Sequence, residues 1–268
     1  MTGHPAPTTL VRGDRTVRLK WHKLRRKPED PPFMRANLCA GLAAGASLEV
    51  DLRRLACGRF VCLHEADLEG ETTGEGPVAA VDAAAMARLE MRHAAGERPL
   101  LLDELVDAVR AGPCAPGALV QLDLKATAAE IDGARATLAA ALGGITHHFI
   151  LSGCDWDAVR RLGGGLPGLA LGYDPYDDAG DDPAQAMRAI RERAPEADTV
   201  YLHRDLMRAA HEHGDPLVAR LRAHGHRVDC WTIDHGQPTA IADLRAAIAA
   251  GCDQITTNSA ASWAAAGL

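Results

Sequence analysis

Aromatic side chains, paired cysteines and long apolar runs are all scarce in this sequence of 268 residues. Aromatics make up 4% of the chain although hydrophobic residues make up 47%. The core must therefore consist mainly of Ala, Leu, Val and Ile, which suits helices packed on a buried parallel sheet. The seven cysteines form no C-x-x-C pair and are odd in number, which argues against a zinc knot or a disulfide framework. No run of about 18 apolar residues and no apolar N-terminal segment occurs, so we expect a cytoplasmic protein with no membrane span.

The charge of the chain is unevenly distributed. The formal net charge is −7, but residues 1–30 carry +5 and the remainder carries −12. Binding to nucleic acid requires a basic surface that neutralises phosphates, so the acidic body argues against a nucleic-acid partner. A basic segment beside an acidic body fits a small phosphate-containing ligand instead, and the alternative for residues 1–18 is a solvated basic tail. The sequence leaves the oligomeric state open.

Short β-branched segments alternate with Ala-rich amphipathic segments along the whole chain. This alternation predicts βαβ units and a parallel sheet, and eight units predict an α/β fold of the (β/α)8 TIM-barrel type, with residues 1–268 as one domain. The expected strands are Val17–Lys23, Ser47–Leu52, Ala118–Lys125, His148–Gly153, Gly168–Tyr173, Asp198–His203, Arg227–Ile233 and Asp253–Thr257. The expected helices between them are Phe33–Ala44, Ala128–Leu142, Trp156–Leu162, Pro183–Arg193, Asp205–His224, Thr239–Ala249 and Ser259–Ala265.

Two segments do not fit the repeating unit. The connection between His64 and Ala118 is too long for a barrel loop, and we interpret residues 65–100 as a small insertion after strand 2. We expect helices near Asp82–His93 and Leu101–Arg110 within this connection. Residues 1–15 are expected to form an N-terminal tail.

Carboxylates occur two residues apart on one expected strand. Glu49 and Asp51 must project from the same face of it, where they repel each other unless a positive group joins them. A hard divalent cation, Mg²⁺ or Ca²⁺, would do so. The alternative is that one or both pair with Arg or Lys.

A second strand carries a similar pattern. Asp123 and Lys125 share one face near its carboxyl end, and the active sites of (β/α)8 barrels lie at that end. A third carboxylate and a lysine would together hold a cation and a phosphoryl oxygen. A structural salt bridge between the two side chains is the simpler alternative.

Two histidines follow the ends of extended segments. His22 ends the first expected strand, and His64 ends the hairpin-like segment 59–63. One imidazole can accept a proton while the other donates one. These positions therefore predict an acid–base pair.

The order and spacing of these residues resemble the glycerophosphodiester phosphodiesterase family. That family has a histidine after strand one, an E-x-D pair after strand two, a second histidine thirteen residues beyond the aspartate, and an acidic residue before a lysine on strand three. The matching segments here are His22, Glu49–Asp51, His64, Asp123–Lys125, the turn 71–76, Cys230–Ile233 and Gly251–Thr257.

The resemblance implies a role for each matching residue. Glu49, Asp51 and Asp123 would hold a divalent cation, Mg²⁺ or Ca²⁺, and His22 and His64 would be general acid and base. Lys125, helped by Lys23, would neutralise the phosphate, and Trp231 would form an apolar wall. The implied reaction is hydrolysis of a glycerophosphodiester, or of a related small phosphodiester of lipid metabolism, to an alcohol and a phosphomonoester.

The sequence departs from the family pattern in three places. His22-Lys23-Leu24 replaces His-Arg-Gly, Pro31-Pro32 replaces a Glu-Asn pair, and Asp123 replaces a glutamate. Asp123 and the segment 231–234 also resemble sphingomyelinase D-like phospholipases, so a phospholipase D-like lyase or transferase that forms a cyclic phosphate is an alternative. A second alternative is a catalytically degenerate barrel that only binds phosphate.

Overall fold

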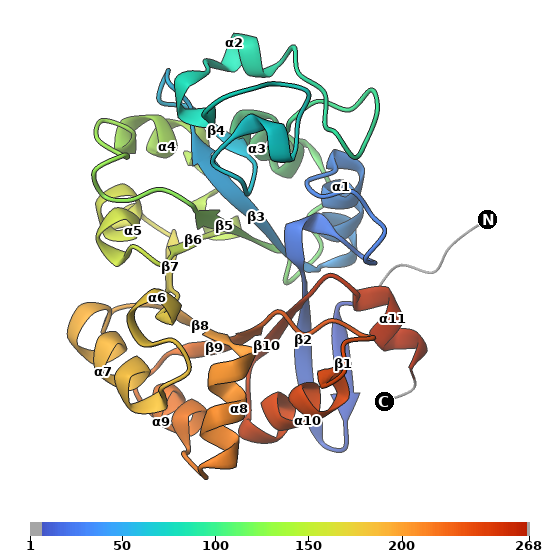
Figure 1. Ribbon diagram of the computed structural model, residues 1–268, viewed down its shortest axis with the longest axis vertical. Coiled ribbons are helices and arrows are strands. Elements are labelled where there is room, and N and C mark those ends of the chain that lie inside the picture. Colours follow the sequence, from blue (N-terminus) through green and yellow to red (C-terminus); the bar gives the residue numbers. More distant parts are fainter. Residues whose placement is uncertain (1–6, 267–268) are drawn as a thin grey trace.

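Eight parallel strands close into a barrel with helices around its outside (Figure 1), which confirms the predicted (β/α)8 fold. The structure is a computed structural model that describes residues 7–266. The barrel closes where β10 and β3 both pair with β2. The barrel strands are β2 (Arg15–Trp21), β3 (Ser47–Arg54), β5 (Leu119–Leu124), β6 (Phe149–Gly153), β7 (Ala170–Tyr173), β8 (Thr199–His203), β9 (Arg227–Trp231) and β10 (Gln254–Thr257). Each overlaps a strand expected from the sequence.

Most of the expected helices are present on the outer surface of the barrel. They are α1 (Arg35–Ala44), α3 (Leu102–Ala111), α4 (Arg135–Leu142), α5 (Trp156–Gly163), α7 (Pro183–Arg193), α8 (Arg204–Glu212), α9 (Leu217–Ala223), α10 (Ala240–Ala250) and α11 (Ala260–Ala265). A further single turn, α6 (Tyr176–Ala179), follows β7. Within residues 7–266, no helix combines the length and the apolarity needed to cross a lipid bilayer.

Two helices differ from the predicted ones because glycine and proline interrupt them. The single helix expected over Asp205–His224 is divided into α8 and α9, since Gly214 has φ +65° and Pro216 has no N–H to continue the helix. The helix α4 starts at Arg135 rather than at Ala128, and Gly133 just before it has φ +73°.

Aspartate side chains cap the starts of two helices, and glycines end two others. At the start of α5, the side chain of Asp155 accepts a hydrogen bond from the backbone N–H of Ala158. At the start of α7, the side chain of Asp182 accepts hydrogen bonds from the backbone N–H groups of Ala184 and Gln185. Gly45 and Gly251 end α1 and α10 in the left-handed conformation, with φ +71° and +91°.

An antiparallel strand extends the barrel at its N-terminal side. In the segment expected to be a tail, β1 (Thr9–Arg12) pairs with β2 through the two-residue turn Gly13–Asp14. Gly13 has φ +61°, which a tight hairpin turn requires. Residues 1–6 of the expected tail lie outside the described residues.

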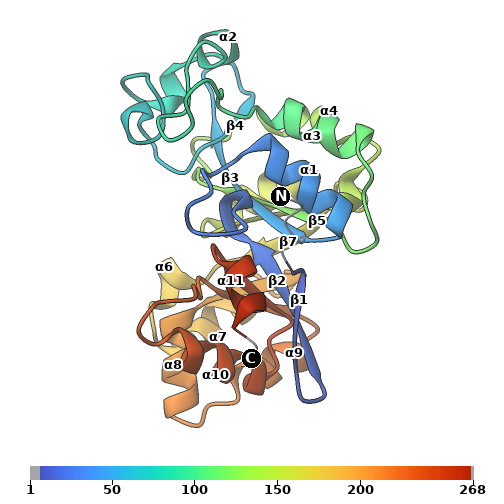
Figure 2. The same ribbon diagram turned by 90° about the vertical axis from the view of Figure 1, so that its right-hand side faces the viewer.

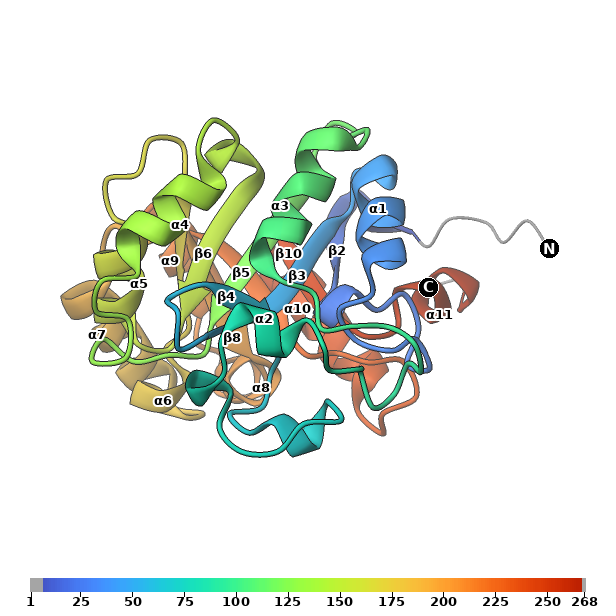
Figure 3. The ribbon, with the colours of Figure 1, turned by 90° about the horizontal axis from the view of Figure 1, so that it is seen from above.

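A second hairpin, at the hairpin-like segment 59–63, precedes the expected insertion. The strand β4 (Phe60–Cys62) pairs with β3 in the antiparallel direction, and short turns then pack over Leu68, Val78 and Met86, which are buried. The helix expected near Asp82–His93 is reduced to one turn, α2 (Ala83–Met86). Figure 2 shows this segment projecting beyond β4, away from the rest of the barrel, and Figure 3 shows α2 and α3 from above.

Candidate active site

A cavity of about 190 Å³ opens at the carboxyl ends of the barrel strands, where (β/α)8 enzymes carry their active sites. Seven of the eight side chains predicted from the sequence line it, and the eighth, Lys23, has its Nζ atom 3.6 Å from Asp51 Oδ2. The lining residues are Lys20, His22, Glu49, Asp51, His64, Gln121, Asp123, Lys125, Asp174, Tyr201, Trp231, Thr232 and Thr256.

Three carboxylates converge in this cavity. Asp51 on β3 lies directly opposite Asp123 on β5 in the sheet register, and Glu49 projects from the same face of β3. Each of the three offers an oxygen atom, and these oxygens all lie within 4.8 Å of one another. Glu49 and Asp51 are buried, whereas Asp123 is partly exposed.

Lysines lie against the carboxylates. Lys125 Nζ is 3.1 Å from Asp51 Oδ1 and 2.5 Å from Asp123 Oδ2, so the salt-bridged pairing considered from the sequence is present. Burial disfavours the charged amine, but Asp123 and Asp51 outweigh this effect and raise the pKa of Lys125. Burial also disfavours a charge on Asp51, yet Lys125 and Lys23 lower the pKa of this carboxyl.

Positive charge is still in deficit around the carboxylates. Burial, together with Asp51 and Asp123, raises the pKa of Glu49 well above its ordinary value. Asp51 Oδ2 is buried and accepts no hydrogen bond from the described residues. A donor set made only of carboxylate oxygens, one of which accepts no hydrogen bond from the described residues, fits a hard divalent cation.

His22 is held in one tautomer by its neighbours. Its Nδ1 atom lies 2.9 Å from Asn258 Oδ1, and the amide Nδ2 of Asn258 donates to Asp234. The amide oxygen therefore faces the ring, so Nδ1 carries the proton. The other ring nitrogen, Nε2, keeps its lone pair and lies 3.8 Å from Glu49 Oε2. Burial lowers the pKa of His22 to about 4, which keeps the ring neutral near pH 7.

His64 is the more exposed of the two histidines. Its backbone N–H donates to the buried carboxylate of Glu71 at 2.7 Å, and its ring Nδ1 is 2.9 Å from Glu65 Oε1. Its backbone carbonyl accepts two hydrogen bonds from the Arg53 guanidinium, which also donates to the carbonyl of Lys125 at 2.6 Å. Arg53 thus ties the backbones of two cavity residues together.

Aromatic rings form the wall of the cavity beside β8 and β9. Trp231 contacts His203 and Tyr176 with ring centroids 4.7 and 5.9 Å away. Asp174, directly after β7, also lines the cavity, and burial raises its pKa to about 8. Trp231 thus adds an aromatic surface to a cavity otherwise rich in charged groups.

The backbone at the first histidine is strained. Lys23 and Leu24 have φ +53° and +60°, although side chains disfavour this left-handed conformation. This conformation directs the backbone N–H of Lys23 toward Glu49 Oε2, with the nitrogen 2.7 Å from the oxygen. Leu24 occupies the position where the family pattern has glycine, and its buried side chain offsets part of the cost.

Sequence reasoning missed several polar residues that support the site. Asp174 and Asn258 each directly follow a barrel strand, and a search for polar residues at strand ends would have found both. Asp234 was seen only as part of a sequence motif, and the structure places it behind Asn258. Ser152 and Gln121 lie inside strands and carry no sequence signal of their own.

Comparisons with known proteins agree with this arrangement. The sequence matches the glycerophosphoryl diester phosphodiesterase family over residues 38–262. A comparison with curated protein sequences finds no significant match. Solved structures match the fold over nearly the whole chain. One is an Oleispira antarctica phosphodiesterase in complex with the product sn-glycerol-3-phosphate, with TM-score 0.71 and 18% identity over 92% of this chain and 95% of that chain.

Two further solved structures are glycerophosphodiester phosphodiesterases. The protein from Parabacteroides distasonis has TM-score 0.68 and 16% identity over 90% of this chain and 92% of that chain. The protein from Agrobacterium tumefaciens has TM-score 0.67 and 17% identity over 91% of this chain and 98% of that chain. At these identities the structures establish the fold, and the sequence match establishes the family. The chain belongs to the glycerophosphoryl diester phosphodiesterase family and is a phosphoric diester hydrolase.

Proposed function

We propose that the protein hydrolyses a glycerophosphodiester, or a related small phosphodiester, to an alcohol and a phosphomonoester with the help of one divalent cation. The observation that carries this proposal is the convergence of Glu49, Asp51 and Asp123 within 4.8 Å of one another, next to two imidazoles and two lysines. A site that only binds phosphate does not need a neutral imidazole with its lone pair toward the cavity.

The three carboxylates would hold the cation, Mg²⁺ or Ca²⁺. When bound, the cation would neutralise charge on the phosphoryl group and act as a Lewis acid there. Lys125 and Lys23 lie against the same carboxylates, so their ammonium groups can also face a phosphate oxygen. The lysine at position 23 supplies a point charge and not the planar fork of an arginine.

The two histidines would divide the proton transfers. His22 is neutral near pH 7 and presents Nε2 to the cavity, so we assign it as the general base that accepts a proton from the attacking water. His64 has the Glu65 carboxylate beside Nδ1 and partly faces solvent. We assign His64 as the general acid. It donates a proton to the oxygen of the leaving alcohol as the bond between that oxygen and phosphorus breaks.

The pocket walls suggest where the two ends of the substrate lie. The phosphate would occupy the side with the carboxylates and lysines. Trp231, with Tyr176 behind it, offers a flat apolar surface for the organic group. The cavity volume of about 190 Å³ suits a small head group.

A substrate screen tests this function directly. The purified protein is incubated with glycerophosphodiesters, lysophospholipids and a generic aryl phosphodiester, with MgCl2 or CaCl2 supplied. We expect cation-dependent release of an open phosphomonoester from at least one glycerophosphodiester. A cyclic phosphate as the main product would favour the lyase alternative, and no turnover of any diester would favour a binding-only barrel.

A further inference from the structure

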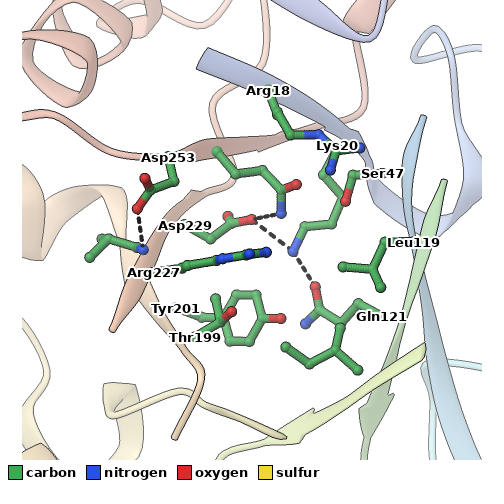
Figure 4. Close-up of a pocket in the computed structure, with 13 residues that line it drawn as sticks. Arg18, Lys20, Ser47, Leu119, Gln121, Thr199, Tyr201, Arg227, Asp229 and Asp253 are labelled. Carbon is green, nitrogen blue, oxygen red and sulfur yellow. Dashed lines mark hydrogen bonds and ion pairs between the residues drawn. The ribbon is translucent and has the colours of Figure 1, made fainter. Parts of the chain in front are cut away.

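A layer of buried polar side chains crosses the inside of the barrel below the carboxylates. Lys20 on β2 and Asp229 on β9 form an ion pair at 2.8 Å, and they are 1% and 0% exposed. Asp229 also accepts hydrogen bonds from Gln254 and Thr256. Figure 4 shows Lys20 Nζ between Asp229 and Gln121, at the inner end of a second cavity of about 360 Å³ that opens at the other end of the barrel.

The hydrogen bonds from this layer lead to one of the carboxylates. Lys20 donates to Gln121 Oε1, and Gln121 Nε2 donates to Ser152 Oγ at 2.8 Å. Ser152 Oγ in turn donates to Asp123 Oδ1 at 2.7 Å. Four side chains from β2, β5 and β6 are therefore connected in series.

The chemistry of the groups fixes the direction of every bond in this series. An ammonium group can only donate, so Gln121 must present its carbonyl oxygen to Lys20 and its NH2 group to Ser152. The Ser152 oxygen must then accept that bond, which directs its single hydrogen to Asp123. The Lys20–Asp229 ion pair holds the first donor in place, so none of these groups is free to reverse.

This series of hydrogen bonds determines the orientation of the Asp123 carboxylate. With Oδ1 held by Ser152, Oδ2 is the oxygen directed to Lys125 and the other carboxylates. A supporting hydrogen bond of this kind sets the orientation and basicity of a ligating group. Asp123 has a shorter side chain than the glutamate of the family pattern, so its placement depends more strongly on such support.

We infer that Ser152 and Gln121 are positioning residues that hold Asp123 for the divalent cation, with the buried Lys20–Asp229 pair fixing the direction of the hydrogen bonds. This inference rests on the proposed function only in that Asp123 is a cation ligand. It assigns no contact with the substrate to Ser152 or Gln121.

The test measures Mg²⁺ binding to the full chain by titration calorimetry, using MgCl2 alone as the probe. Ser152→Ala removes the donor to Asp123, and Gln121→Met removes the amide while keeping the length of the side chain. Each is expected to weaken Mg²⁺ binding about 10- to 100-fold, the usual effect of losing the support of a ligand. Lys20 is left intact, because removing one partner of a buried ion pair strongly destabilises a fold.

The double variant distinguishes a series of hydrogen bonds from general damage to the barrel. Because Gln121 acts on Asp123 through Ser152, adding Gln121→Met to Ser152→Ala should cause no further loss of Mg²⁺ affinity. Ser47→Ala is the matched control, since Ser47 is 1% exposed inside the barrel and outside this series. It should leave the affinity unchanged, and thermal unfolding of all variants checks that each is folded.

Each outcome decides the inference. Unchanged Mg²⁺ affinity in Ser152→Ala and Gln121→Met, additive losses in the double variant, or no Mg²⁺ binding by the unaltered protein would overturn it. The binding measurement needs no substrate, so the expected pattern in a protein that turns over no phosphodiester would support the positioning role and refute the proposed function. Turnover of a phosphodiester by the unaltered protein, together with unchanged Mg²⁺ affinities in the variants, would support the proposed function and refute the positioning role.

Discussion

The Nδ1 atom of His22 lies 2.9 Å from the Oδ1 atom of Asn258, a residue 236 positions later in the chain. Asp234 accepts hydrogen bonds from both the backbone and the side-chain N–H of Asn258, at 2.6 and 2.9 Å. The amide is thereby fixed with its oxygen toward the imidazole, and the base nitrogen of His22 points into the cavity. Asn258 and Asp234, which follow β10 and β9, therefore determine which nitrogen of the His22 ring carries the proton.

Replacing Asn258 by leucine should impair catalysis without preventing binding. The ring of His22 would then lose the acceptor that selects its tautomer, and kcat should fall about 10- to 100-fold, within the range that acid–base groups contribute. KM should change little. Steady-state kinetics check this, with His148→Gln at the opposite end of the barrel as a control that should behave like the unaltered protein. A change confined to KM would assign Asn258 to substrate binding instead.

The pH dependence of turnover should follow the lowered pKa of His22. A general base works in its neutral form, which predominates above its pKa, so activity is kept above that value and lost as the pH falls through it. Burial lowers the pKa of His22 to about 4 from the ordinary 6.5. The acid limb of kcat/KM should therefore lie well below pH 6.5.

A pH–rate profile at two saturating MgCl2 concentrations provides the measurement. A limb that stays in place when the concentration of Mg²⁺ is raised belongs to the histidine and not to the loss of bound cation. An acid limb near pH 6.5 would mean that His22 is not the base.

Arg53 should be needed for activity although it does not line the cavity. Its guanidinium donates to the backbone carbonyls of His64 and Lys125, which a lysine cannot bridge because it lacks the planar fork. Arg53→Lys should lower kcat/KM about tenfold or more, through displacement of the two cavity residues. Arg54→Lys, one residue along on the other face of β3, serves as the matched control. Equal losses in both variants would indicate a general effect on β3.

The fold was more predictable than the site. All eight barrel strands and most helices follow from the alternation of β-branched and amphipathic segments, which is a local property of the chain. The break between α8 and α9 and the β1–β2 hairpin were missed, although Gly214, Pro216 and Gly13 signal both. These errors are also local, and closer attention to glycine and proline would correct them.

The supporting residues of the site could not be predicted in the same way. The motif spacing named Glu49, Asp51 and Asp123, and the structure brings these carboxylates together. The partners that orient the site, such as Asn258 and Ser152, act across strands that are far apart in sequence. Their contacts depend on side-chain direction and barrel register, which no local pattern encodes.

Chelation and the removal of His64 should have separable effects. EDTA should abolish turnover, and Mg²⁺ or Ca²⁺ should restore it, because carboxylate oxygens prefer hard cations. His64→Ala should reduce turnover by about 10²-fold or more while leaving Mg²⁺ affinity unchanged, since the ring is assigned to proton transfer. Turnover assays and calorimetry on the same preparations check both. Full activity in EDTA, or in a variant lacking both His22 and His64, would refute the mechanism.

The central claim is that one cation binds between three carboxylates from β3 and β5. Crystals grown with MnCl2 allow the most direct test, because the anomalous scattering of Mn²⁺ locates the ion without reference to activity. We predict one strong peak within about 2.0–2.4 Å of oxygens from Glu49, Asp51 and Asp123, in the distance range of hard cations. No peak at this position, or a peak bound by other residues, would contradict it.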